Sequence, residues 1–298
     1  MPTMEAGMKV REFCTDEYKD HVIYRTLASR EKNVERRMIL EKLANEEYKH
    51  YLYWKKILGV ECDAKVSRLF LWVVIVSRII LGLTFTLKML ERGEEETIEE
   101  YKNYIGSLEG EEKQELESII EDEVMHESSL MSQIDETVVK YMSFIVLGLA
   151  DAIVEITGVH AGFLGVTSST IVAGIAGLVV GFSAAISMAS AAYLQAKHDF
   201  ERNPVSSALV TGLSYIGAVI ILASPYFATY NMVLAFTVSV SFAVTLIATF
   251  TFYGSVVFDK RFLREFLEST GLMLGTAFAA YFFGEILGVY FGVRGVFK

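Results

Sequence analysis

The sequence predicts an all-α chain of two domains, a four-helix bundle followed by a five-helix transmembrane domain. The charged residues are divided unevenly: residues 1–136 contain 19 Lys+Arg and 29 Asp+Glu, whereas residues 137–298 contain 8 of each. The first part has apolar residues at helical spacing and no proline after Pro2, and the second has long runs without charge. These observations place a domain boundary near residue 136.

The first domain carries the whole net charge of −10. This acidic character argues against nucleic acid as a partner and is compatible with cation binding. The only cysteines, Cys14 and Cys62, form no CxxC or metal-ligand pattern and are interpreted as fitting a reducing compartment.

The first domain is expected to be helical almost throughout, with helices at 12–31, 33–58, 66–104 (broken near Gly93) and 111–136. Within the third, the apolar stretch 69–90 is long enough for a sixth span, but Arg78 stands at its middle and Lys88 near its end. We favour the alternative, a buried or membrane-surface helix of the soluble domain, because a sixth span would invert the loop charges considered next.

The second domain is predicted to contain five membrane spans, since a span needs about 20 apolar residues. We expect them at about 140–163, 167–194, 205–224, 229–253 and 270–292. Their many small residues are typical of helices that pack closely in lipid.

The orientation of the spans follows from Lys and Arg in the loops. Loops 195–204 and 254–269 together carry five of these residues, and the loop and tail on the other side carry two. The positive-inside rule therefore predicts a multi-pass protein, most simply of a prokaryotic plasma membrane, with a cytoplasmic amino-terminal domain and an outside carboxy terminus.

Two segments of the acidic domain share one spacing. NEEYKHYLYW contains Glu47 three residues before His50, and EDEVMHESSL contains Glu123 three residues before His126. A helix brings positions i and i+3 to one face, so each pair can offer a carboxylate and an imidazole to one metal site. Two such helices, with one Glu from each of two others, make a di-iron or di-manganese bundle.

The other two helices supply candidate ligands. These are Glu17 on the first helix and Glu91 or Glu94 on the third. Thirty residues separate Glu17 from Glu47 and 32 separate Glu91 from Glu123, which fits antiparallel helices meeting at one level. One such motif would arise easily by chance among so many glutamates, but two with matched partners favour a metal site.

Several segments resemble rubrerythrin-type ferritin-like domains. EYKDHVIYRTLA resembles their first ligand helix, in which the ligand Glu stands seven residues before a Tyr, here Glu17 and Tyr24. EEYKH resembles the second helix and ERGE the third. The resemblance implies a ferritin-like four-helix bundle with an Fe cofactor (a di-iron site), or Mn. The paired CxxC motifs of rubrerythrin proper are absent, which argues against its full electron-transfer cycle.

The first span carries unexpected charges in GLADAIVEITGVHAG. Asp151 and Glu155 are four residues apart and stack on one helix face, and such a pair inside a bundle typically marks an ion or proton path. Met188 on the second span offers a thioether at membrane depth, although core packing would be the better explanation of this residue taken alone. His160 lies about half a turn away from Asp151 around the helix, and Glu285 near the end of the fifth span lines an exit or reaches the interface.

The same stretch resembles the first span of the vacuolar iron transporter family. ISMASAAYLQAK resembles the second span, and NPVSSALVTGLSYI, SPYF and FTFYGSV continue the match. The fusion resembles the membrane-bound ferritin (erythrin–vacuolar iron transporter) family over about residues 12–292. The sequence departs from the transporters at Ala192, where they commonly have Glu, and in the short connection LQAKHDFERNP, where they insert a Glu-rich segment.

The resemblance implies a homodimeric exporter of Fe²⁺ or Mn²⁺ with protons as counter-ions. The bundle would capture metal in the cytosol, and Asp151 and Glu155, with Met188, would form the transport path in the lipid bilayer. The alternative is a membrane-anchored di-iron oxidase or peroxidase of the rubrerythrin type. A ferroxidase or peroxidase side activity of the bundle is compatible with either interpretation.

Overall fold

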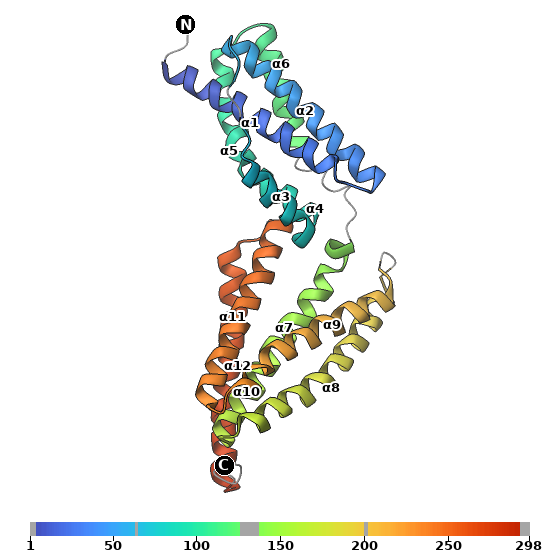
Figure 1. The fold of residues 1–298 in the computed structure, drawn as a ribbon, viewed down its shortest axis with the longest axis vertical. Coiled ribbons are helices and arrows are strands. Elements are labelled where there is room, and N and C mark those ends of the chain that lie inside the picture. The colour runs from blue at the N-terminus through green and yellow to red at the C-terminus, as the bar shows by residue number, and fades with distance from the viewer. Residues whose placement is uncertain (1–3, 63–64, 126–136, 200–201, 293–298) are drawn as a thin grey trace. The chain divides into compact units, whose positions relative to one another are not determined.

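The computed structural model describes residues 4–62, 65–125, 137–199 and 202–292, and these ranges contain helices but no strand (Figure 1). The prediction of an all-α chain is confirmed for them. The chain divides into two compact units, Met1–Glu136 and Thr137–Lys298, and the division falls where the balance of charged residues changes.

The described residues of the first unit form six α-helices and two short 3₁₀ turns. They are α1 (Met4–Ala28), α2 (Val34–Leu58), α3 (Arg68–Leu81), α4 (Leu83–Leu90), η1 (Glu91–Gly93), α5 (Glu94–Tyr104), η2 (Ile105–Ser107) and α6 (Glu111–Met125). The Asn33 side chain caps α2 by accepting from the Arg36 amide, and Gly59 ends the helix in the left-handed conformation that glycine adopts without strain.

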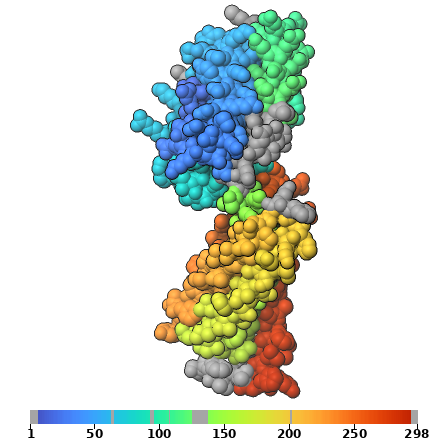
Figure 2. Space-filling model, turned by 90° about the vertical axis from the view of Figure 1, so that its right-hand side faces the viewer, coloured from blue at the N-terminus to red at the C-terminus, as the bar shows by residue number. Residues whose placement is uncertain are grey.

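Four helices contribute to one aromatic core in this unit. Phe13 of α1, Trp54 of α2 and Tyr101 of α5 pack together with ring centroids 4.8–4.9 Å apart, and Leu116 of α6 is buried in the same cluster. α2 and α6 lie side by side, blue and green in Figure 2. This core holds α1, α2, α5 and α6 at the level where the acidic side chains meet.

The predicted helix 66–104 is broken at Gly82 as well as near Gly93. Gly82 has φ 94° and ψ 167°, which a side chain would oppose, so α3 ends there and α4 begins. The hydroxyls of Ser77 and Thr86 lie 3.1 Å apart across the bend. Nine residues of unbroken helix would separate them by about 13 Å, so stretch 69–90 folds back instead of running as one span.

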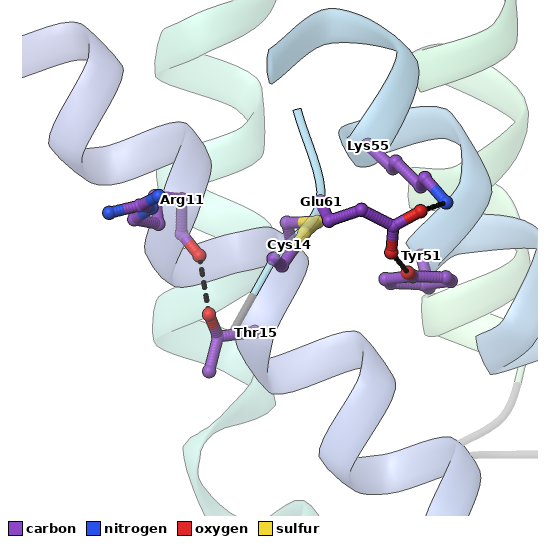
Figure 3. The surroundings of a disulfide bond; sticks show 7 residues. Arg11, Cys14, Thr15, Tyr51, Lys55 and Glu61 are labelled. Atoms are coloured by element: carbon purple, nitrogen blue, oxygen red, sulfur yellow. Dashed lines mark hydrogen bonds and ion pairs between the residues drawn. A yellow bond between two sulfur atoms is a disulfide. The ribbon is translucent and has the colours of Figure 1, made fainter. Parts of the chain in front are cut away.

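The two cysteines form a disulfide that ties α1 to the chain after α2 (Figure 3). Cys14 is fully buried, and next to Cys62 the Glu61 side chain pairs with Lys55 and accepts from Tyr51. This pairing corrects the interpretation of both cysteines as reduced thiols. Disulfides are rare where thiols are kept reduced, but intracellular proteins of hyperthermophiles contain them, so the bond by itself assigns no compartment. Sequence separation hid the pairing: 48 residues divide the two positions.

The second unit contains the predicted apolar helices. They are α7 (Thr137–Val166), α8 (Thr170–Ala196), α9 (Pro204–Ala223), the short α10 (Pro225–Ala228), α11 (Met232–Val257) and α12 (Phe262–Tyr290). Among the described residues, five helical segments are long and apolar enough to cross a membrane, with α9 and α10 counted as one. The fifth begins at Phe262, eight residues before the expected start at 270, and Arg264 and Glu268 pair as i, i+4 neighbours on its first turns.

Glycines bring α7 and α12 into close contact. A Cβ atom added at Gly284 would meet the backbone carbonyl of Gly162, and one added at Gly165 would meet the backbone of residues 281–285. Because backbone cannot move aside as a flexible side chain can, these positions set the separation of the two helices.

We expect Gly284→Ala to destabilise the second unit by about 1–3 kcal/mol, the usual cost of overpacking. Gly275→Ala is the matched control on the same helix, because nothing lies within 4 Å of the Cβ it would add. Thermal unfolding in detergent measures both. An unfolding temperature of Gly284→Ala equal to that of the control would contradict this account of the packing.

The disulfide leads to a second testable prediction. Protein denatured without reductant should take up no iodoacetamide at Cys14 or Cys62, as mass spectrometry would show, whereas reduced protein should take up two. Closing a loop of 48 residues stabilises a fold by about 4 kcal/mol in the chain-entropy treatment, so reduction should also lower the unfolding temperature. Alkylation of both thiols before reduction would be inconsistent with the bond.

Candidate metal centre

Four of the predicted ligands meet in the first unit. Glu17 of α1, Glu47 and His50 of α2 and Glu123 of α6 each offer one ligand atom, and these atoms all lie within 4.8 Å of one another. All four side chains are buried. We call this group the Glu/His cluster.

The imidazole of His50 lies among the three carboxylates. Its Nδ1 is 2.9 Å from Glu123 Oε1, 3.5 Å from Glu17 Oε2 and 3.7 Å from Glu47 Oε2. Glu47 and His50 share a face of α2 because they are three residues apart, as the motif predicts. The other two carboxylates come from α1 and α6, which the aromatic core packs against α2.

Two further residues contact the cluster, and neither was predicted from the sequence. The hydroxyl of Tyr101 donates to Glu17 Oε1, and Oδ2 of Asp122 lies 3.6 Å from Nε2 of His50 on the side away from the cluster. A carboxylate behind an imidazole fixes the ring orientation of a metal-binding histidine. One signal could have found Tyr101: it follows Glu94 by seven residues, as Tyr24 follows Glu17.

Burial and neighbouring charge make the cluster hold protons. Desolvation raises the pKa of Glu17 well above its usual range, and Glu123 and Glu47 add to the effect while His50 opposes it. For His50, burial alone would lower the pKa, but hydrogen bonds with Glu123, Glu17 and Glu47 outweigh it and the pKa lies well above its usual range. When no cation is bound, protons neutralise the negative charge of these buried carboxylates.

A small cavity of about 50 Å³ opens beside the cluster. Asp16 and Asp20 of α1 line it together with Glu17, Glu47, Thr97, Ile98, Tyr101 and Glu123. Burial raises the pKa of Asp20 well above its usual range, and the nearby Glu47 adds to this. The cavity therefore offers a cation an approach lined by carboxyl groups.

The donor set fits a divalent transition metal. Three carboxylates and one imidazole suit Fe²⁺, Mn²⁺ or Zn²⁺ better than the all-oxygen sites that Ca²⁺ and Mg²⁺ prefer. Buried carboxylates at this separation also repel one another strongly unless a cation or protons intervene. The four residues present therefore fit one divalent metal ion.

The remaining predicted ligands are not part of this group in the described residues. Glu91 is buried and accepts a hydrogen bond from Tyr24, 3.1 Å from the hydroxyl oxygen. Tyr24 stands seven residues along α1 from Glu17, about 10 Å, so this pair lies two turns from the Glu/His cluster. Glu94 begins α5, but its side chain lies outside the described part, as does the whole of His126.

The acidic pair of the second unit lies on one side of α7. Asp151 is exposed on the surface of the single chain, and Glu155 is half-buried and accepts a hydrogen bond from the hydroxyl of Tyr215 on α9. Tyr215 is fully buried and was not singled out from the sequence. Met188 is half-buried and packs against the same apolar cluster, which includes Ile153 and Ala185.

His160 and Glu285 lie apart from the acidic pair. The buried ring of His160 packs on Tyr226 of α10, with centroids 4.1 Å apart, and against Gly177 of α8. Glu285 of α12 lies beside Gly165 of α7, about 20 Å along that helix from Asp151. Ala192 is fully buried against Tyr141 and Phe144, so a glutamate at this position would have to displace apolar side chains.

No family model, curated protein or solved structure matches this chain. The interpretation of the two sites therefore depends on their residues and geometry. In the described part of the chain, these show helices suited to a membrane and a buried group suited to a metal.

Metal binding at the Glu/His cluster should release protons and should weaken as the pH falls. A metal takes only deprotonated ligands, and the raised pKa values of Glu17 and His50 mean that protons must leave first. Each proton displaced makes the affinity change by about tenfold per pH unit. Calorimetric titration of the full chain with Mn²⁺ in two buffers of different ionisation enthalpy measures the number released.

The control for this titration is His50→Ala, which removes one of the protonated ligands and should reduce both proton release and affinity. Equal heats in the two buffers for the unmodified chain would mean that the cluster binds metal without losing a proton, contrary to the expectation.

Proposed function

We propose that the chain is a metal exporter that moves Fe²⁺, or Mn²⁺, across a membrane in exchange for protons. The first unit captures the ion at the Glu/His cluster in the cytosol, and the second carries it past Asp151 and Glu155. A homodimer, with the path between two copies of the second unit, completes the proposal.

The observation that carries the proposal is the acidic pair on α7. A charged side chain within the hydrocarbon region costs about 2.5–3.5 kcal/mol on insertion scales, so it is retained where it has a task. Helices that serve only as an anchor have no use for Asp151 and Glu155, nor for a buried tyrosine that donates to one of them. An ion path uses all three.

The exposure of Asp151 supports the dimer. Ionisable side chains in spans face a bundle interior or a water-filled cavity, and Asp151 faces neither in the single chain. A second copy packed against this side of α7 would enclose the carboxylates of both chains. Four carboxylates in one enclosed path would bind a divalent cation when ionised and take up protons when the cation leaves, which is the chemistry that antiport needs.

The two sites differ in the ligands they offer, and the difference gives each a distinct task. The Glu/His cluster includes an imidazole, which favours transition metals over Mg²⁺ and Ca²⁺. The acidic pair offers only oxygen, whose weaker hold on Fe²⁺ and Mn²⁺ suits a site that must release its ion. With these donor sets, the first unit would select the metal ion and the second unit would transfer it.

We expect Asp151→Asn to abolish metal flux while binding by the first unit persists. The substitution keeps the shape of the side chain and removes the charge that attracts the ion. Uptake of Fe²⁺ and Mn²⁺ into proteoliposomes under an imposed pH gradient measures flux, and calorimetry on the same protein measures binding. Glu268→Gln, an exposed carboxylate at the start of α12, is the control and should leave flux unchanged.

The same preparations distinguish the exporter from a membrane-anchored di-iron oxidase. An oxidase would consume oxygen with Fe²⁺ at an undiminished rate in Asp151→Asn and lose that activity in Glu47→Ala. Normal flux in Asp151→Asn would rule out the transport path proposed here, and metal-dependent turnover with no flux in the unmodified chain would favour the anchored enzyme.

A further inference from the structure

An apolar surface of the first unit has no partner among the described residues. α3 presents outward the side chains of Leu69, Phe70, Trp72, Val73, Ile79 and Ile80, which we call the outer face of α3. Trp72 is 61% exposed and Ile80 is 72% exposed. Large apolar side chains gathered on one surface mark a protein or membrane contact, because soluble surfaces rarely carry them together.

The outer face is one stripe of the helix. Positions 69, 72, 73 and 80 stand at i, i+3, i+4 and i+11, which share a side of an α-helix. The opposite side packs inward, where Val74 is buried in the apolar cluster that includes Leu27 and Leu40. α3 is therefore anchored in the fold by one side and is free to contact an apolar phase with the other.

The charge around α3 is opposite to that of its unit. The stretch 65–90 contains four Lys+Arg and no Asp or Glu, within a unit in which acidic residues outnumber basic ones by 29 to 19. Arg78 is used internally, 2.7 Å from Glu31. Lys65 and Arg68 are exposed where α3 begins. An apolar stripe with a tryptophan and a basic end is the composition of helices that lie in the headgroup region of anionic bilayers.

The length of the connection to the candidate spans limits how far the first unit can lie from a bilayer. α6 ends at Met125 and the apolar α7 begins at Thr137, so eleven residues join the first unit to the first candidate span. A chain of that length reaches at most about 40 Å. This connection gives the outer face a high effective concentration at the membrane surface. A weak contact between the outer face and lipid is then enough to keep the two together.

We propose that the outer face of α3 binds the surface of the bilayer that α7 crosses, and that it prefers anionic lipid. α3 has 14 residues and is about 21 Å long, too short to span, and Gly82 ends it. It lies along the interface with Trp72 and Ile80 at the level of the acyl chains. The metal-binding unit is thereby held against the membrane instead of moving freely at the end of its tether.

The two tryptophans of the chain make the test direct. Trp72 is on the outer face, Trp54 is fully buried in the aromatic core, and the second unit contains no tryptophan. The full chain is reconstituted in nanodiscs of ordinary or brominated lipid, since bromine on acyl chains quenches tryptophan emission on contact. We expect weaker emission in brominated lipid, and we expect Trp72→Phe to remove the difference because Trp54 lies away from lipid.

Quenching is also compared among variants of the outer face and between bilayers of different lipid composition. The double variant Leu69→Glu/Ile80→Glu should lose most of the quenching, whereas Met38→Glu, at an exposed apolar position of α2 that is 56% exposed, should keep it. Quenching should be stronger in nanodiscs that contain phosphatidylglycerol than in phosphatidylcholine alone. If the double variant does not fold, as judged by its circular dichroism, the comparison of Trp72→Phe with the unmodified chain decides the matter alone.

Three outcomes overturn the proposal. If emission is equal in both lipids and aqueous iodide quenches Trp72, the face lies in water. If neither bromine nor iodide reaches Trp72, protein covers the face, as a second copy would. Equal quenching with and without phosphatidylglycerol overturns the preference for anionic lipid.

Discussion

The first unit depends on the burial of three carboxylates around one imidazole. Taking such charges out of water costs several kcal/mol for each ion, and only a cation, protons or good hydrogen bonds repay it. α1, α2 and α6 each contribute to the cluster, and α5 contributes the hydroxyl of Tyr101. The packing of these helices therefore creates a requirement for positive charge that a bound metal ion or protons would meet, and the aromatic core holds the same helices together.

The second unit also places carboxylates among packed helices, but it does so through close backbone contacts and one tyrosine hydroxyl. Its helices approach closely through glycines, so backbone contacts hold α7 against α12 while α9 brings Tyr215 to Glu155. The acidic pair is left incomplete on the surface of one chain. A site that is completed only by further protein or by water differs from the enclosed Glu/His cluster, in which all four side chains are buried within one chain.

The sequence predicted much of this because helical spacing is local. The motifs containing Glu47 and Glu123, and Glu17 one helix earlier, were enough to anticipate three carboxylates and His50 in one place. The choice between Glu91 and Glu94, one turn apart, depends on how the chain bends around η1, which spacing does not encode. Asp122 contacts His50 and Tyr101 donates to Glu17. Both partners are distant in sequence, so spacing along one helix could not predict these contacts. The pairing of Cys14 with Cys62 was invisible for the same reason.

Gly82 has a consequence for how the chain enters its membrane. An unbent helix over residues 69–90 would be about 33 Å long, enough to cross a hydrocarbon core of about 30 Å. The insertion machinery would then meet six apolar segments instead of five. An added crossing would move the second unit's loops to the opposite sides of the bilayer and would pull the Glu/His cluster's own helices apart. One glycine conformation thus separates a chain with five candidate spans from one with six.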